Sequence, residues 1–274
     1  MTKPDLPARA SRLGDTSRLW LSRLAFFVVF VALWELLFRL NLWPDYIFPA
    51  PSEVLAALAR GFGNGTFWIG ILGSMRRLVQ GYLIALVIGL TLGVIMAEWR
   101  WFKNTFGLLA LGLQTLPSIS WLPLALLWFG LNERAILFVI VMGAVLSIAQ
   151  ATEDGIRNTA PIYMRAARNL GARGWRLYVQ VVLPAALPSI VTGMKLGWSF
   201  AWRSLMAGEL LYTLPGLGNL LSMGRELNDM SQVIAVMLVI ITLGVIGDQL
   251  LFGIVERRIR ERWGLAPRKN ERGM

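Results

Sequence analysis

The chain has 274 residues, of which 56% are hydrophobic, and its mean hydropathy is +0.58. It carries 27 Lys and Arg residues against 16 Asp and Glu residues, a formal net charge of +11. Because the sequence contains no cysteine and no histidine, it excludes a disulfide framework, a zinc site built from these residues and acid–base catalysis by histidine.

The apolar residues fall in long blocks, which is typical of a membrane protein with several spans. Examples are residues 24–37, 82–97, 135–149 and 233–255. Apolar stretches of roughly 18–25 residues can cross a bilayer as helices, which satisfy their own backbone hydrogen bonds there. The sequence therefore predicts an all-α membrane protein with about six transmembrane helices.

The basic residues lie mainly in short segments between and beyond these blocks. A nucleic-acid-binding protein would need a basic, water-facing domain, whereas an excess of Lys and Arg is expected on the cytosolic side of any membrane protein. We therefore expect no nucleic-acid partner, and we expect a multi-pass protein of the cell inner membrane with both termini in the cytosol.

Along the chain, residues 1–18 are polar and contain prolines, which predicts a disordered cytosolic tail. A first span follows at about 19–40. The prolines and aromatic residues of 43–52 suit a membrane interface. Residues 53–61 then carry apolar side chains on one side, which indicates a short helix along the outer surface.

A second span is predicted at about 74–97, where Gly89 and Gly93 are spaced for close contact between helices. The third span, at about 106–129, is interrupted by Pro117 and Pro123. Such a broken helix either lines a pathway or is a structural kink in a buried helix.

The second half of the chain continues the pattern. The fourth span is predicted at about 135–152, the fifth at about 187–212 and the sixth at about 232–255. Between the last two, residues 213–231 contain a Pro-Gly-Leu-Gly turn cluster. We expect a transmembrane domain at 19–256 and a basic cytosolic tail at 257–274.

The long polar stretch at about 153–184 contains the most specific pattern in the chain. An Ala-Ala pair precedes a glycine, and an aliphatic-x-Leu-Pro sequence follows. The residues in register are Ala166, Ala167, Gly171, Val181, Leu183 and Pro184. The pattern resembles the EAA loop of ABC importer permeases, except that Arg165 occupies the position of the family glutamate.

The residues themselves also favour a short helix. Pro161 suits its first turn and Gly171 its end. The helix would expose Arg165, Arg168 and Leu170 as a knob for a groove on a soluble partner. The alternative is an ordinary basic, amphipathic surface helix.

Three other segments extend the resemblance over nearly all of residues 45–262. The segment 48–54 is similar to an outer segment of the permease branch that serves nitrate, taurine and aliphatic sulfonates. Residues 116–130 and 216–218 are similar to its third span and its outer loop. The resemblance implies a type I ABC importer permease fold and a translocation pathway for a small anionic solute.

The resemblance also implies partners: a second permease copy, two ABC ATPase subunits and a soluble substrate-binding protein. The chain has no Gly-x-x-x-x-Gly-Lys-Ser/Thr phosphate loop, so ATP hydrolysis is expected in a separate subunit. We expect no catalytic residue, no metal and no cofactor in this chain.

Charges inside a span are costly and usually face protein or water. The fifth span carries a stripe at helical spacing, which predicts a translocation path that favours an anion. Its residues are Lys195, Ser199, Trp202, Arg203 and Met206. The alternative is that Arg203 and Glu209 form structural ion pairs. Asp248 stands in the sixth span without an assigned partner.

Two rival functions remain open at this point. A secondary transporter or channel could share the spans and their charges but would have no use for an ATPase-docking loop. A membrane enzyme would need convergent acid, base or nucleophilic groups, which the sequence does not suggest. The cargo could also be bicarbonate or an uncharged or cationic heterocycle.

Overall fold

The computed structural model describes residues 11–40, 44, 47–255 and 258, and every regular element among them is a helix. Five helices are long and apolar enough to cross a membrane, or six if one bent pair counts as a span. The predicted all-α class and the approximate number of spans are confirmed. The predicted basic tail, 257–274, lies outside the described residues except for Arg258.

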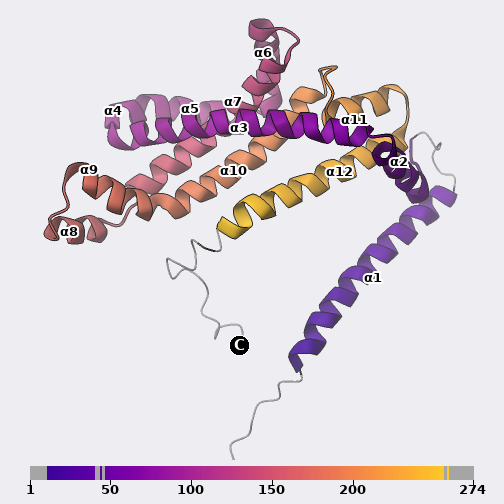
Figure 1. Ribbon diagram of the computed structural model, residues 1–274, viewed down its shortest axis with the longest axis horizontal. Coiled ribbons are helices and arrows are strands. Elements are labelled where there is room, and N and C mark those ends of the chain that lie inside the picture. The colour runs from indigo at the N-terminus through magenta and orange to yellow at the C-terminus, as the bar shows by residue number, and fades with distance from the viewer. Residues whose placement is uncertain (1–10, 41–43, 45–46, 256–257, 259–274) are drawn as a thin grey trace, which may run out of the picture.

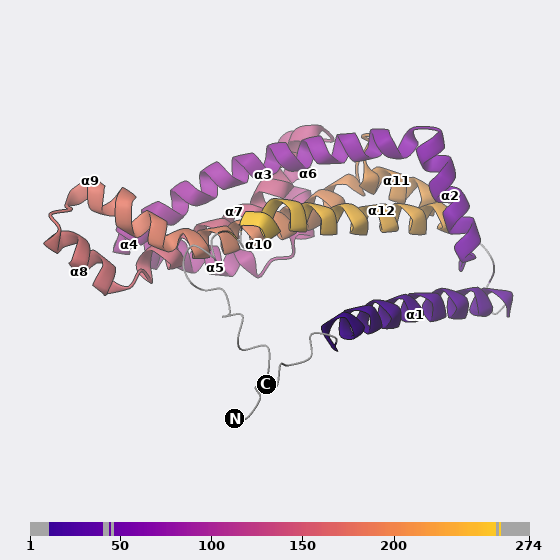
Figure 2. The same ribbon diagram turned by 60° about the horizontal axis from the view of Figure 1, so that its bottom comes forward.

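The first helix, α1 (Ser11–Arg39), lies apart from the other spans in both views (Figures 1 and 2). It begins eight residues before the predicted span, so the prediction of disorder up to residue 18 is wrong for residues 11–18. In the second half of α1, the Trp34 indole donates a hydrogen bond to the Pro49 carbonyl, at 3.0 Å. The helix α2 (Pro51–Gly63) follows and corresponds to the predicted surface helix.

Three long helices form the core: α3 (Thr66–Glu98), α7 (Glu133–Arg157) and α10 (Leu183–Glu209), with α7 packed against both others. An added Cβ at Gly89 would lie 2.9 Å from the Val145 carbonyl oxygen, and one at Gly93 would lie 2.5 Å from that of Ala149. The predicted close contact at these glycines is confirmed, and it involves α7.

The third span is broken into two arms, with a bend of 107° between them. Thr115–Pro117 separates the arms, and Pro123 occupies the first turn of α6 within the second arm. The bend places α6 at a steep angle to the bundle (Figure 1). The elements are α4 (Arg100–Phe102), the π-helix η1 (Lys103–Gly107), α5 (Leu108–Gln114), the 3-10 helix η2 (Ser118–Trp121) and α6 (Leu122–Phe129).

Between α7 and α10 the chain forms an elbow, which we define as residues 161–177. It contains α8 (Pro161–Asn169) and α9 (Gly174–Leu177), and the π-helix η3 (Tyr178–Val182) joins it to α10. The elbow projects from one end of the bundle, while α2 and α11 lie at the opposite end (Figures 1 and 2).

The predicted loop 213–231 contains a helix, α11 (Leu217–Glu226), which the turn cluster did not reveal. The last span is α12 (Met230–Asp248), continued by the π-helix η4 (Gln249–Gly253). The side chain of Asp229 accepts a hydrogen bond from the Gln232 amide, at 2.9 Å, and so caps the start of α12.

Candidate functional site

The elbow begins and ends through local backbone signals. Pro161 occupies the first turn of α8, where its missing N–H is no loss. At the other end Gly171 has a φ of +86°, which L residues rarely adopt. The Gly171 amide donates to the Arg168 carbonyl (3.0 Å) and the Ala172 amide to that of Ala167 (2.9 Å). This pair of bonds is a Schellman motif.

One face of the elbow packs onto α7 and α10. Ala167 is buried, and Met164 packs against a cluster that includes Ile156 of α7 and Ala186 of α10. Residues three apart on a helix share a face, which places Met164 and Ala167 together. Ala166 is exposed, so of the alanine pair only Ala167 packs against the bundle. The elbow is therefore fixed to two long helices.

The remaining residues of the motif also divide into an exposed residue and residues that pack against the bundle. Arg165 is exposed on α8. Val181, Leu183 and Pro184 are half-buried where η3 passes into α10. Leu183 packs in the same cluster as Met164, so this end of the motif forms the root of the elbow.

A cavity of about 440 Å³ lies at the bend of the third span and is lined by Pro117, with α7 and α10 opposite. Gln114 of the bend donates a hydrogen bond to Ser147 of α7, at 3.5 Å. Arg203 of α10 lines the same cavity, and its guanidinium carbon lies 5.7 Å from the Phe200 ring centroid. In the described part of the chain no carboxylate lies within 4.0 Å of Arg203.

Lys195 and Ser199 lie elsewhere, on a smaller cavity of about 280 Å³. The Lys195 ammonium lies 3.3 Å from the Asp248 carboxylate of α12. This ion pair supplies the partner of Asp248 that the sequence left unassigned. It also gives Lys195 a structural role that Arg203 lacks.

The last two residues of the predicted stripe pack inside the bundle. Trp202 and Met206 are half-buried against both large apolar clusters of the core. An added Cβ at Gly244 of α12 would lie 3.2 Å from the Trp202 ring nitrogen. The structure therefore brings only Arg203 of the five to the larger cavity.

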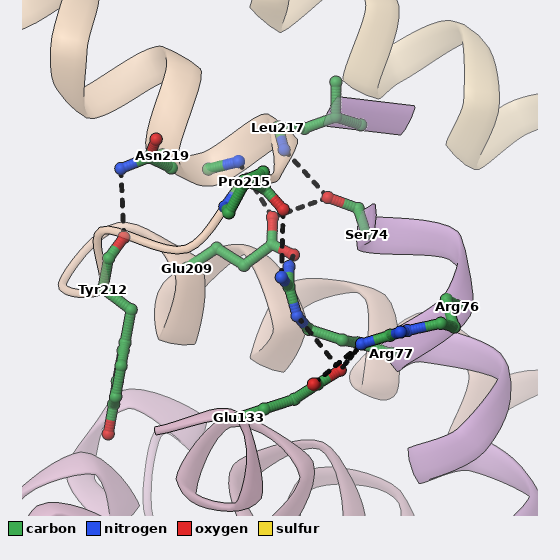
Figure 3. Close-up of polar contacts among 10 residues, drawn as sticks. Ser74, Arg76, Arg77, Glu133, Glu209, Tyr212, Pro215, Leu217 and Asn219 are labelled. Atoms are coloured by element: carbon green, nitrogen blue, oxygen red, sulfur yellow. Dashed lines mark hydrogen bonds and ion pairs between the residues drawn. The ribbon is translucent and has the colours of Figure 1, made fainter. Parts of the chain in front are cut away.

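A buried polar network that the sequence did not locate ties the end of α10 to the start of α3 (Figure 3). The Glu209 carboxylate is fully buried. It accepts hydrogen bonds from Arg77 Nη1 (2.6 Å), Ser74 Oγ (2.6 Å) and the Gly218 amide (3.0 Å). The structural ion pair that the sequence allowed for Glu209 is present, with Arg77 as the partner.

The same network explains the Gly-Leu-Gly sequence at residues 216–218. Ser74 Oγ accepts a hydrogen bond from the Leu217 amide, at 2.8 Å. Together with Glu209 it caps the start of α11. A Cβ at Gly218 would lie 2.5 Å from Glu209 Cβ, so only glycine fits there. The sequence signals that could have located this network were the charges of Arg77 and Glu209 near the ends of two spans, because charges inside a span are costly and need partners.

A second cluster of charges lies near the elbow. Glu153 is buried at the end of α7, where its Oε1 lies 2.6 Å from Lys103 Nζ and 3.3 Å from Arg157 Nε. Lys103 belongs to η1. The cluster therefore joins the third span to the helix that carries the elbow.

The sequence matches a known family. The model of the family described as binding-protein-dependent transport system inner membrane component matches residues 85–261. A protein of Methanocaldococcus jannaschii named "putative ABC transporter permease protein" is 33% identical, over 80% of this chain and 84% of its own length. The taurine transport system permease protein TauC of Escherichia coli is 27% identical, over 72% and 74%.

The bicarbonate transport system permease protein CmpB of Synechococcus elongatus is 31% identical, over 69% of this chain and 68% of its own length. Among solved structures, an inward-facing form of the MetNI methionine ABC transporter aligns with a TM-score of 0.62. The alignment covers 71% of this chain and 96% of that one at 18% identity, which shows that the fold is shared.

Proposed function

The chain belongs to the family of binding-protein-dependent transport system inner membrane components and is the permease subunit of an ABC importer. We propose that two copies of the chain form the pathway for a small solute with an anionic group. Separate ATPase subunits would drive the pathway through the elbow.

The observation that carries this proposal is that the elbow and the Arg203 cavity share two helices. Ile156 of α7 and Ala186 of α10 hold the elbow. The same helices present Ser147 and Arg203 to the cavity. Packed helices move as rigid elements, so a displacement of the elbow by an ATPase would change the shape of the cavity.

The chemistry of the cavity favours an anion. Arg203 offers several N–H donors in one plane, which suits an oxyanion. Gln114, Ser118 and Ser147 line the same cavity and add neutral polar groups. A taurine system and a bicarbonate system among the relatives carry solutes of this kind. Nitrate and aliphatic sulfonates fit the same chemistry, whereas a cationic heterocycle would be repelled by Arg203.

The exposure of Arg203 supports the presence of a second copy of the chain. Its side chain is exposed in the single chain, although it lies within a span, where a charge is expected to face protein or water. We infer that a second permease covers the open side of the cavity, so that both arginines face one pathway.

The sidedness follows from the distribution of charge. The elbow carries Arg165, Arg168, Arg173 and Arg176 and lies at the end opposite to α2 and α11. We propose that the elbow and both termini lie in the cytosol. The α2–α11 end would then receive the substrate-binding protein.

One experiment distinguishes this proposal from the alternative, a secondary transporter that works without an ATPase. The permease is tagged, expressed in its native background and purified in mild detergent. We expect a P-loop ATPase to copurify and uptake into proteoliposomes to require ATP. Uptake driven by an ion gradient, with no ATPase bound, would reject the proposal.

A further inference from the structure

The elbow is a concentration of positive charge without local counter-charge. Its arginines are exposed, and none lies within 4.0 Å of a described carboxylate. The sequence contains no Asp or Glu between Asp154 and Glu209. The arginines are Arg165, Arg168, Arg173 and Arg176.

The opposite end of the bundle is different. There Arg39 pairs with Glu35, Arg76 with Glu133, and Arg77 with Glu209. An arginine paired with a carboxylate of the same chain leaves little net electrostatic field. The arginines of the elbow leave a positive field that a partner can meet. Arg60, Arg134 and Arg225 at that end also have no described carboxylate within 4.0 Å, but they lie on three separate helices, whereas the four arginines of the elbow lie together within residues 165–176.

Apolar side chains accompany the charge. Leu170, at the tip of the elbow, is 89% exposed, and Trp175 is 77% exposed. Exposed large apolar residues rimmed by charge are typical of protein interfaces, whose centres are rich in Trp and Arg. Arg165 and Arg168 are three residues apart on α8 and so lie on one side of it.

The position of the elbow favours a protein over lipid. In both views it extends beyond α4 along the length of the bundle (Figures 1 and 2). A basic helix that lay flat on lipid head groups would sit level with the ends of the spans, with its apolar face toward the acyl chains. Here Met164 and Ala167 face the bundle and Arg165 faces away from it.

We propose that the ATPase surface that receives the elbow is acidic, with a carboxylate opposite Arg165. The inference rests on the proposed function, because it takes the ATPase as the occupant. Arg165 occupies the position of the glutamate in the EAA loop that this segment resembles. The permease therefore brings a positive and not a negative side chain to the contact at this position. The partner groove must supply anionic acceptors for Arg165 and Arg168 and an apolar pocket for Leu170.

The test measures binding of the copurified ATPase to the permease in nanodiscs. Arg165→Glu should weaken binding about tenfold or more, and Arg165→Lys should retain most of it, since charge complementarity sets this contact. Binding of the unaltered permease should weaken as salt rises from about 0.05 M to about 0.3 M, because the screening length shortens. Arg134→Glu, at the opposite end, is the matched control and should bind as the unaltered protein does.

Three outcomes would overturn the inference. If Arg165→Glu binds the ATPase more tightly, the groove is basic. If Arg165→Glu binds unchanged, Arg165 has no anionic partner there. If the effect of Arg165→Glu disappears when phosphatidylglycerol is removed from the nanodiscs, the elbow recognises lipid. Failure of the unaltered permease to bind any ATPase would instead reject the proposed function itself.

Discussion

Arg77 Nη1 and Glu209 Oε1 lie 2.6 Å apart in a fully buried ion pair that joins the second span to the end of the fifth. The same carboxylate caps α11 through the Gly218 amide, while Arg77 Nη2 donates to the Pro215 carbonyl at 3.0 Å. A single charge pair thus holds the loop and the helix at the end of the bundle opposite the elbow.

Breaking this pair should strongly destabilise the protein. Arg77→Ala leaves the Glu209 carboxylate buried without its counter-charge, which typically costs about 3–5 kcal/mol. Arg76→Ala is the control, because Arg76 is exposed and its pair with Glu133 contributes about 0–1 kcal/mol. Thermal unfolding in detergent measures both variants. Equal midpoints for the two would show that the buried pair does not stabilise the fold.

The glycine beside Glu209 should be intolerant of a side chain. Gly218→Ala brings a methyl group within 2.5 Å of Glu209 Cβ, and overpacking of this kind costs about 1–3 kcal/mol. Gly63→Ala, where a Cβ meets nothing within 4 Å, should be neutral or slightly stabilising. The same thermal assay applies. A stable Gly218→Ala protein would mean that α11 can move away from α10.

Arg203 and Lys195 should differ in their effect on transport. Arg203→Gln removes the cation of the larger cavity and should lower ATP-driven uptake of an anionic cargo about tenfold or more. Lys195→Gln is the comparison, since Lys195 is paired with Asp248; it should lower stability by about 1 kcal/mol and leave the KM for cargo unchanged. Uptake into proteoliposomes, measured as a function of cargo concentration, compares the two variants. If Lys195→Gln is the variant with raised KM, the pathway runs on the α12 side.

The elbow should depend on the backbone of Gly171. Its φ of +86° costs an L residue about 1–2 kcal/mol, so Gly171→Ala should distort the end of α8. We expect ATP hydrolysis to continue while uptake falls. Gly171→Asn, whose side chain tolerates this conformation better, should retain more uptake. Equal uptake by both variants and the unaltered protein would show that this turn plays no part in coupling.

The spans, the broken third span and the elbow follow from the sequence because each depends on local signals. Apolar length gives the spans, Pro117 the break, and Pro161 with Gly171 the ends of α8. The pairing of Arg77 with Glu209 does not follow, because it joins residues 132 positions apart. Helix α11 was missed since its cap comes from Ser74 and Glu209 and not from a residue beside it.

The stripe on the fifth span shows a further limit. Helical spacing places Lys195, Ser199 and Arg203 near one another on α10, but it does not say which neighbour each one meets. α12 faces Lys195 and supplies Asp248, while the bend at Pro117 opens the cavity that reaches Arg203. Lys195 and Arg203 are separated by less than about a quarter turn around the axis of α10. This small rotation places the lysine in an ion pair and the arginine on the candidate pathway.

Movement of the elbow should reach the cavity through α7 and α10. The chain has no cysteine, so Ile119→Cys on the wall of the cavity gives one spin label per copy and one distance across a dimer. We predict that trapping ATP on the assembled importer changes this distance by several ångströms, and that Gly171→Ala abolishes the change. A change of the same size in the Gly171→Ala protein would show that the cavity moves independently of the elbow.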